Sequence, residues 1–291
     1  MEEPVNFSVQ VDSETAIEAY TELDNYRIEE NPKAASNLCA IYFSSNDIYY
    51  PNTEAVLRDR ILEKDRYEWY PNRIQKAQRH IFVRDIRKQW FLTGINQSIS
   101  SIPLLCELLA EKTKGMKVVT IGSSAGGYAA ILVGQYLNAQ RILAFNPQFS
   151  IEDILVNSSE SRDPIVFRNA ADKAYRKYFD ITEKVSERVY YFCSIRSGWD
   201  KEQLSLVEGK PLNILRFRSS NHGIPFPRTL LQTVINLSDS QLQAISRTEH
   251  HPIAFSIRHR GFFQTLLDLT GLIKKRIKKK RLEKKDQQHN G

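Results

Sequence analysis

Residues 120–130 read TIGSSAGGYAA, and this stretch decides which fold the chain can adopt. It contains the pattern G-x-S-x-G from Gly122 to Gly126, with Ser124 at its centre. An apolar, β-prone run, residues 116–121, precedes the pattern, and a helix-like run, residues 128–137, follows it. Small residues two positions before and after the serine allow a tight turn that lifts the hydroxyl above the edge of a sheet. The stretch therefore predicts a strand, a sharp turn carrying an exposed serine, and a helix.

Two serines stand side by side in this turn, and the steric pattern selects one of them. Centring the turn on Ser123 would put Ile121 and Ala125 at the crowded positions, where isoleucine would clash. Ser124 is therefore the candidate nucleophile. A turn that only permits close packing is the structural alternative. A phosphate-binding loop fits poorly, because neither a G-K-[ST] ending nor G-x-G-x-x-G spacing is present.

The rest of the chain alternates strand-like and helix-like segments. Continuous apolar strands separated by helices indicate a parallel sheet that is covered on both faces. The predicted fold class is α/β, with a mostly parallel central sheet, helices on both faces and a basic C-terminal helical tail. The expected strands are residues 38–44, 80–84, 117–121, 141–145, 188–195 and 212–217.

A nucleophilic serine needs a base, and the base needs an acid that orients it. On a sheet of this kind the acid and the histidine follow the serine, each in a loop after a later strand. Asp200 lies in RSGWDKEQ after one expected strand, and His222 lies in RSSNHGIPF after the next. A helix N-cap is the alternative role for Asp200, and a solvated loop histidine is the alternative for His222. The other candidates fit this order less well: Asp163, Asp180, His80, His250, His251, His259 and His289.

An oxyanion that develops during acyl transfer needs backbone N–H donors aimed at it. The amide of Ala125, directly after the candidate nucleophile, is one predicted donor. The second is expected from a loop after an early strand. Ser45 and Asn46, which follow the run LCAIYF, are the candidates, and the side chain of Asn46 can instead stabilise the turn.

The order Ser124, Asp200, His222 resembles that of the α/β-hydrolase fold. Over residues 36–235 the chain is similar to a subset of that fold found in bacterial capsule and lipopolysaccharide biosynthesis, which includes O-acetyltransferases. The resemblance is carried by IGSSAGGYAAILVG, AFNPQ, RDIRKQWFLTGI and the GWD and NHG loops. In place of the HGGG-type oxyanion motif of secreted esterases, this chain has FSSN.

The resemblance implies transfer of an acyl group through an acyl-serine to a hydroxyl of a cell-surface polysaccharide or glycolipid. It also implies acetyl-CoA as the acyl donor and no bound cofactor, whereas the sequence itself shows no coenzyme A motif. An esterase would use the same residues with water as the acceptor. The aromatic residues Trp69, Tyr70 and Trp90 either stack on sugar rings or pack in the core. The alternative function is a non-catalytic binding or assembly protein on the same fold.

The net charge of +7 is concentrated at the C-terminus. Residues 274–286 hold nine Lys or Arg against Glu283 and Asp286, which accounts for the whole excess. Residues 261–277 have apolar residues at helical spacing and lead into this run. A basic amphipathic helix predicts attachment to an anionic membrane surface through Lys274–Lys285, with a solvated terminus as the alternative. Nucleic-acid binding is disfavoured, because no aromatic-rich RNA motif or helix-turn-helix accompanies the run.

Cysteines and terminal segments indicate the compartment. Cys39, Cys106 and Cys193 each lie in an apolar run without metal-ligand spacing, which predicts buried thiols in a reducing compartment and no metal site. The acidic start lacks the apolar core of a secretory signal. We therefore expect a cytoplasmic protein, peripheral on the inner face of the membrane if the tail binds lipid. The expected division is an N-terminal extension over 1–35, an α/β-hydrolase-like catalytic domain over 36–245 and a helical, strongly basic tail over 246–291; the oligomeric state is not predicted.

Overall fold

A computed structural model of the chain describes residues 11, 13–268 and 270–271. Its centre is an eight-stranded sheet in the order β1-β3-β2-β4-β5-β6-β7-β8. All neighbouring strands are parallel except β1 and β3, which pair antiparallel. The mostly parallel sheet is therefore confirmed. Its strands are β1 (Tyr26–Glu30), β2 (Leu38–Phe43), β3 (Arg79–Val83), β4 (Lys117–Ser123), β5 (Arg141–Phe145), β6 (Val189–Ser194), β7 (Asn213–Phe217) and β8 (Glu249–His250).

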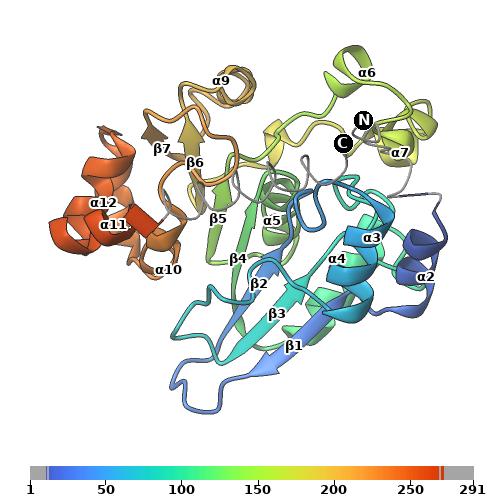
Figure 1. Ribbon diagram of the computed structural model, residues 1–291, viewed down its shortest axis with the longest axis horizontal. Helices are drawn as coiled ribbons and strands as arrows, with labels where there is room; N and C mark the ends of the chain where they lie inside the picture. The colour runs from blue at the N-terminus through green and yellow to red at the C-terminus, as the bar shows by residue number, and fades with distance from the viewer. Residues whose placement is uncertain (1–10, 12, 269, 272–291) are drawn as a thin grey trace, which may run out of the picture.

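Helices lie around this sheet and above the edge at which its parallel strands end (Figure 1). The helices α6, α7 and α9 occupy that upper edge, whereas α10, α11 and α12 lie together at one end of the molecule. The α-helices are α2 (Glu14–Glu22), α3 (Glu54–Leu57), α4 (Ile102–Lys112), α5 (Ala125–Tyr136), α6 (Ile154–Asn157), α7 (Pro164–Arg168), α8 (Lys173–Arg176), α9 (Gly198–Ser205), α10 (Leu231–Val234), α11 (Asp239–Ser246) and α12 (Pro252–Arg260).

Both faces of the sheet are buried, and β2 shows this most clearly. Every residue of β2 is buried. Its odd-numbered residues join a cluster with apolar residues of α4 and α5, while its even-numbered residues join a second cluster with residues of α10, α11 and α12. Successive side chains of a strand point to opposite faces, so a strand covered on both sides needs a continuous apolar run. This is why the run LCAIYF predicts a strand.

The two outermost strands were not predicted from the sequence. β1, with the sequence YRIEE, is half-buried and ends in two glutamates, and β8 is only two residues long. An edge strand needs no continuous apolar run, so neither segment carries that signal. β1 belongs to the segment that we expected to lie outside the catalytic domain, yet it pairs with β3 of the main sheet. The domain boundaries at residues 35 and 245 stay predictions.

The prediction that the three cysteines are buried thiols is confirmed. Cys39, Cys106 and Cys193 are buried and free. Burial raises the pKa of the Cys39 and Cys106 thiols to about 12 and that of Cys193 to about 11. No helix in the described part of the chain is long and apolar enough to cross a membrane. The basic run Lys274–Lys285 lies outside the described residues.

Candidate active site

The strand β4 ends at Ser123 and α5 begins at Ala125, so Ser124 alone makes the turn between them. Its backbone has φ 53° and ψ −123°, a conformation that a residue with a side chain rarely adopts. The amide of Ser124 donates to the carbonyl of Phe145 at 2.8 Å, and its carbonyl accepts from the amide of Tyr128 at 3.0 Å. Bonds to a neighbouring strand and to the following helix thus hold the strained residue in place.

The two glycines of the pattern are required by close backbone contacts. A Cβ atom at Gly122 would lie 2.0 Å from the carbonyl oxygen of Gly126, and one at Gly126 would lie 2.3 Å from the carbonyl oxygen of Phe43. Both neighbours are backbone atoms of buried elements, so moving them aside is costly. The spacing of the G-x-S-x-G pattern therefore follows from the way the turn packs on itself and on the end of β2.

A Gly126→Ala substitution is expected to lower the free energy of unfolding by about 2–4 kcal/mol, because the backbone must move to admit the methyl group. Gly198→Ala is the matched control, since a Cβ at Gly198 meets nothing within 4 Å. Its effect should stay within about 0.5 kcal/mol. Urea denaturation of the two variants checks this, and equal stability would show that the turn is looser than described.

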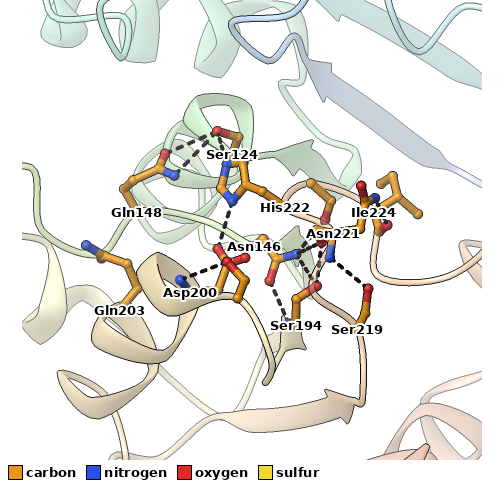
Figure 2. A network of polar contacts seen from close by, with 12 residues as sticks. Ser124, Asn146, Gln148, Ser194, Asp200, Gln203, Ser219, Asn221, His222 and Ile224 are labelled. Atoms are coloured by element: carbon orange, nitrogen blue, oxygen red, sulfur yellow. Dashed lines mark hydrogen bonds and ion pairs between the residues drawn. The ribbon is translucent and has the colours of Figure 1, made fainter. Parts of the chain in front are cut away.

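Ser124, His222 and Asp200 form one continuous chain of hydrogen bonds (Figure 2). The Oγ of Ser124 lies 2.9 Å from Nε2 of His222, and Nδ1 of His222 lies 2.8 Å from Oδ1 of Asp200. If Nδ1–H donates to the carboxylate, Nε2 is left as the acceptor for the serine hydroxyl. These side chains are thus arranged for proton transfer from Ser124 to His222. They come from the turn after β4, the first turn of α9 and the loop after β7, so Asp200 lies in a helix and not in the expected loop.

Asp200 is placed by α9 and does not cap that helix. The N-cap is Ser197, whose Oγ accepts from the amide of Asp200 at 3.4 Å. Asp200 itself is 1% exposed and directs its carboxylate to His222. Its second carboxylate oxygen is buried and has no hydrogen-bond partner among the described residues. The capping alternative for Asp200 is therefore wrong.

The loop that carries His222 is fixed by the ends of two strands. Asn146, directly after β5, donates its side-chain amide to the carbonyl of Gly223 at 2.9 Å. Ser194, the last residue of β6, donates its hydroxyl to the carbonyl of Asn221 at 2.7 Å. Asn146 also accepts from the amide of Ser194 at 2.8 Å, which links the two anchors (Figure 2). His222 is therefore held from both flanking residues.

Trp199 supports His222 from a different direction. The indole ring stacks on the imidazole with ring centres 5.2 Å apart and planes 15° apart. Because Trp199 directly precedes Asp200, two consecutive residues hold the same histidine, one against its face and one at its edge. An aromatic face favours a cation that forms on the imidazole.

Of the backbone amides predicted to donate to the oxyanion, some are free to do so and one already donates to another residue. The amide of Ala125 belongs to the first turn of α5, whose N–H groups lack partners within the helix. The amide of Ser45 instead donates to the carboxylate of Glu68 at 2.6 Å. Ser45 is therefore not free to act as a donor, which corrects the prediction, and Asn46, which lines the cavity at Ser124, remains the second candidate.

Gln148 is a neighbour of Ser124 that the sequence reasoning missed. Its side-chain amide lies 3.4–3.5 Å from Oγ of Ser124. The indole N–H of Trp90 donates to Oε1 of Gln148 at 3.0 Å, and an indole can only donate. The amide nitrogen of Gln148 is consequently the group free to donate toward Ser124. Its place two residues after Asn146, beyond the end of β5, is the signal that could have indicated it.

The three aromatic residues considered for stacking on sugar rings lie in different environments. Trp69 is buried and donates its indole N–H to the carbonyl of Phe43 at 2.9 Å, so it packs in the core. Tyr70 is exposed and lies under the guanidinium of Arg73. Trp90 is almost fully buried, yet it lines the cavity at Ser124.

A cavity of about 610 Å³ opens at Ser124 and His222. Asn46, Asn52 and three aromatic residues contribute to its wall. Burial raises the pKa of both Asp153 and Asp163. Asp163 is bonded to Ser158 and so is not the partner of His222. The charged groups on the wall are four carboxylates and two cations: Asp47, Asp153, Asp163, Glu202, Lys88 and Arg162.

Lys88 is the buried basic side chain on this wall. It is 2% exposed, its ammonium contacts the side-chain oxygen of Asn52, and it lies 4.2 Å from the ring centre of Tyr49. Burial lowers the pKa of Lys88 from 10.5 to about 7. The carboxylate of Asp85 accepts hydrogen bonds from the backbone amides of residues 88, 89 and 91. These bonds fix the loop that carries Lys88 and Trp90.

The pKa of Lys88 predicts a pH dependence of stability. Between pH 7 and 10.5 the unfolded chain holds the proton of this lysine and the folded protein does not, so the folded state gains stability as pH rises through this window. Wild type should gain about 2 kcal/mol relative to Lys88→Met between pH 7 and 9. Urea denaturation at both pH values measures this difference, and parallel curves would refute it.

Comparisons with known proteins were made for sequence and for structure. No protein-family model matches the chain, and a search of curated proteins finds no match either. Among solved structures, the capsule O-acetyltransferase of Neisseria meningitidis serogroup A is 14% identical, covers 78% of this chain and 93% of its own, and has a TM-score of 0.47. The Wnt deacylase Notum from Drosophila is 11% identical over 77% of this chain and 88% of its own, with a TM-score of 0.43.

A third similar structure is acetyl xylan esterase 1 from Thermoanaerobacterium, at 12% identity over 65% of this chain and 70% of its own, with a TM-score of 0.38. At such identities and scores these proteins are only what the chain is similar to. The assignment of its architecture rests on its own sheet order, its strained serine turn and the helix that follows. On those grounds the chain has an α/β-hydrolase fold.

Proposed function

We propose that the protein catalyses acyl transfer through an acyl-serine intermediate at Ser124, most plainly the transfer of an acetyl group to a carbohydrate hydroxyl. The observation that carries this proposal is the unbroken hydrogen-bond chain from Ser124 through His222 to Asp200, at a strained turn that opens into a cavity. A non-catalytic scaffold has no need of this arrangement or of its strain.

In the proposed mechanism His222 moves one proton in each half-reaction. Nε2 takes the proton of Ser124 as Oγ attacks the acyl carbonyl. The oxyanion of the tetrahedral intermediate accepts hydrogen bonds from the backbone N–H groups of Ala125 and Asn46. The imidazolium then protonates the leaving group, which departs and leaves the acyl group on Oγ. In the second half, Nε2 takes the proton of the acceptor hydroxyl as the acceptor oxygen attacks the acyl-serine. The imidazolium then returns this proton to Oγ of Ser124, which leaves as the product ester is released. Asp200 keeps the imidazole in the required tautomer and stabilises its cation.

Gln148 is proposed to donate a further hydrogen bond beside the reacting oxygen. Gln148→Ala is expected to lower kcat about 10- to 100-fold, because a pre-oriented donor next to the developing charge is lost. KM should change less than kcat if the bond matters mainly in the transition state. Steady-state kinetics measure this split; an unchanged kcat in a folded variant would remove Gln148 from the mechanism.

The wall of the cavity supports an uncharged polyhydroxyl acceptor. Carboxylates and side-chain amides accept hydrogen bonds from hydroxyl groups, and aromatic side chains offer apolar faces. With four carboxylates against two cations, the wall is unfavourable for a polyanion. If acetyl-CoA is the donor, its phosphates would therefore stay outside the cavity while the thioester reaches Ser124.

Hydrolysis is the second candidate, and one observation favours it. The side chain of His222 is 34% exposed, so water can reach the base that would activate it. An esterase would form the same acyl-serine and pass the acyl group to water. Which reaction dominates depends on whether a bound acceptor excludes water.

The test measures release of free CoA from acetyl-CoA with and without neutral oligosaccharide acceptors, and follows the acetyl group by mass spectrometry. Release that depends on the acceptor, with an acetylated sugar as product, is the expected result. Release to water alone would support the esterase. A folded protein that forms no acyl-enzyme with acetyl-CoA or with simple activated esters would contradict the proposal.

A further inference from the structure

The chain segment that follows α12 exposes an unusual set of large apolar side chains. Residues 262–268 are helical and begin after Gly261. Phe262, Phe263, Leu266 and Leu267 are all exposed, Phe263 by 81% and Leu267 by 64%. Their spacing puts them on one side of the helix, and we call these four residues the apolar face. A surface helix ordinarily turns such a side toward the core.

The polar side of the same segment is the one that contacts the protein. Thr265 is 3% exposed, and its hydroxyl donates to the carbonyl of Gly261 at 2.9 Å. Asp268 forms an ion pair with Arg260 of α12 at 3.2 Å and is largely covered. The ion pair of Asp268 thus links the segment to α12, and Thr265 is buried on the same side, while the apolar face is exposed. This inverted arrangement leaves several apolar side chains in water, which is costly unless another apolar phase covers them.

The charge of the sequence that follows the apolar face indicates which kind of partner fits it. Immediately beyond the described residues, positions 274–286 carry nine basic and two acidic residues. A second copy of the chain would bring an equally basic run to the same place, which like-charge repulsion opposes. An anionic bilayer surface offers an apolar interior for the face and negative headgroups for the run.

We propose that the apolar face and the basic run together dock the protein on an anionic lipid surface. The phenylalanine and leucine side chains enter the boundary between headgroups and acyl chains, and the lysines and arginines bind the headgroups. Two weak signals combined in this way give stable attachment where either alone is marginal. The proposal does not depend on the reaction at Ser124, because none of the four residues of the apolar face lines the cavity.

The experiment is co-sedimentation of the full chain with vesicles of phosphatidylcholine, alone or mixed with phosphatidylglycerol. Phe263→Ser/Leu267→Ser is expected to weaken binding to the mixed vesicles more than about 10-fold, since two apolar side chains lose their burial. The matched control is Val156→Ser/Tyr136→Ser, which removes two exposed apolar residues elsewhere and should bind like wild type. Wild type should bind pure phosphatidylcholine weakly and should leave the mixed vesicles as salt rises.

Several outcomes would overturn the proposal. Equal binding by wild type and Phe263→Ser/Leu267→Ser would exclude the apolar face, and failure of wild type to bind mixed vesicles would exclude lipid altogether. Two further measurements distinguish the other possible partners of the apolar face: light scattering after gel filtration for a second copy of the chain, and a binding assay for RNA. A wild-type dimer that this variant converts to a monomer would identify a second copy as the partner, and binding to RNA without binding to vesicles would identify nucleic acid. Acyl-transfer activity measured without lipid is expected to be unchanged in the variant, so this test fails or succeeds independently of the proposed reaction.

Discussion

Replacement of Ser124 by alanine is expected to lower kcat for an activated acetyl ester by about 10⁴- to 10⁶-fold. The substitution removes the only hydroxyl that contacts Nε2 of His222 among the described residues. Without it no acyl-enzyme forms, and the remaining rate comes from binding and oxyanion stabilisation alone. Ser124 has φ 53°, and alanine tolerates this conformation no worse than serine, so the variant should fold. Turnover assays together with thermal denaturation check both parts.

The matched control is Ser123→Ala. Ser123 is the last residue of β4 and is buried, and the hydrogen bond to His222 is made by Ser124 instead. Its hydroxyl has no step in the mechanism, so kcat should change by less than about 3-fold. A loss of turnover in Ser123→Ala that equals the loss in Ser124→Ala would mean that the turn, and not the nucleophile, is being measured.

Asp200→Asn is expected to lower kcat by about 10³- to 10⁴-fold while leaving the fold intact. An asparagine has nearly the same shape, but its amide N–H can face Nδ1 of His222 and leave the proton on Nε2, where it blocks acceptance from Ser124. The buried carboxylate also stabilises the imidazolium, and a neutral amide does this less well. Steady-state turnover of an activated ester measures the effect.

Glu202→Gln is the control for Asp200→Asn. Glu202 is a carboxylate of the same helix and also lines the cavity, but it does not contact His222. Its replacement should alter KM for a bulky acceptor more than kcat for a small ester. Equal losses of kcat in the two variants would indicate a general effect of cavity charge and would refute the specific role of Asp200.

The central part of the fold could be predicted because burial on two faces leaves a direct trace in the sequence. Strands such as β2 and β6 are buried at every position and are apolar throughout except for Ser194 at the end of β6. β1 and β8 lie at the two edges of the sheet and have no such constraint. Their pairing depends on partners far along the chain, which local patterns do not record.

Those site residues could be predicted whose position relative to the strands is fixed by the order of the chain. The turn requires glycine at positions 122 and 126, which produces the recognisable G-x-S-x-G pattern. Asp200 and His222 could be located because each follows a later strand, Asp200 in the first turn of α9 and His222 in a loop. The structure brings these side chains together, while their catalytic roles stay predictions. Ser45 was misjudged because Glu68, which binds its amide, lies in a separate loop. Gln148, Trp199 and Lys88 lie in the stretches AFNPQ, GWD and RDIRKQWFLTGI that carry the resemblance. The sequence assigns them no role, because each makes its contacts at the site only in the folded protein.

The most direct test of the account is labelling with a fluorophosphonate probe, which reacts only with an activated serine, followed by mass-spectrometric mapping of the modified residue. Modification of Ser124 is expected in wild type and Ser123→Ala, and none in Ser124→Ala or His222→Ala. Labelling of another residue, or labelling retained by folded Ser124→Ala, would contradict the claim that Ser124 is the nucleophile.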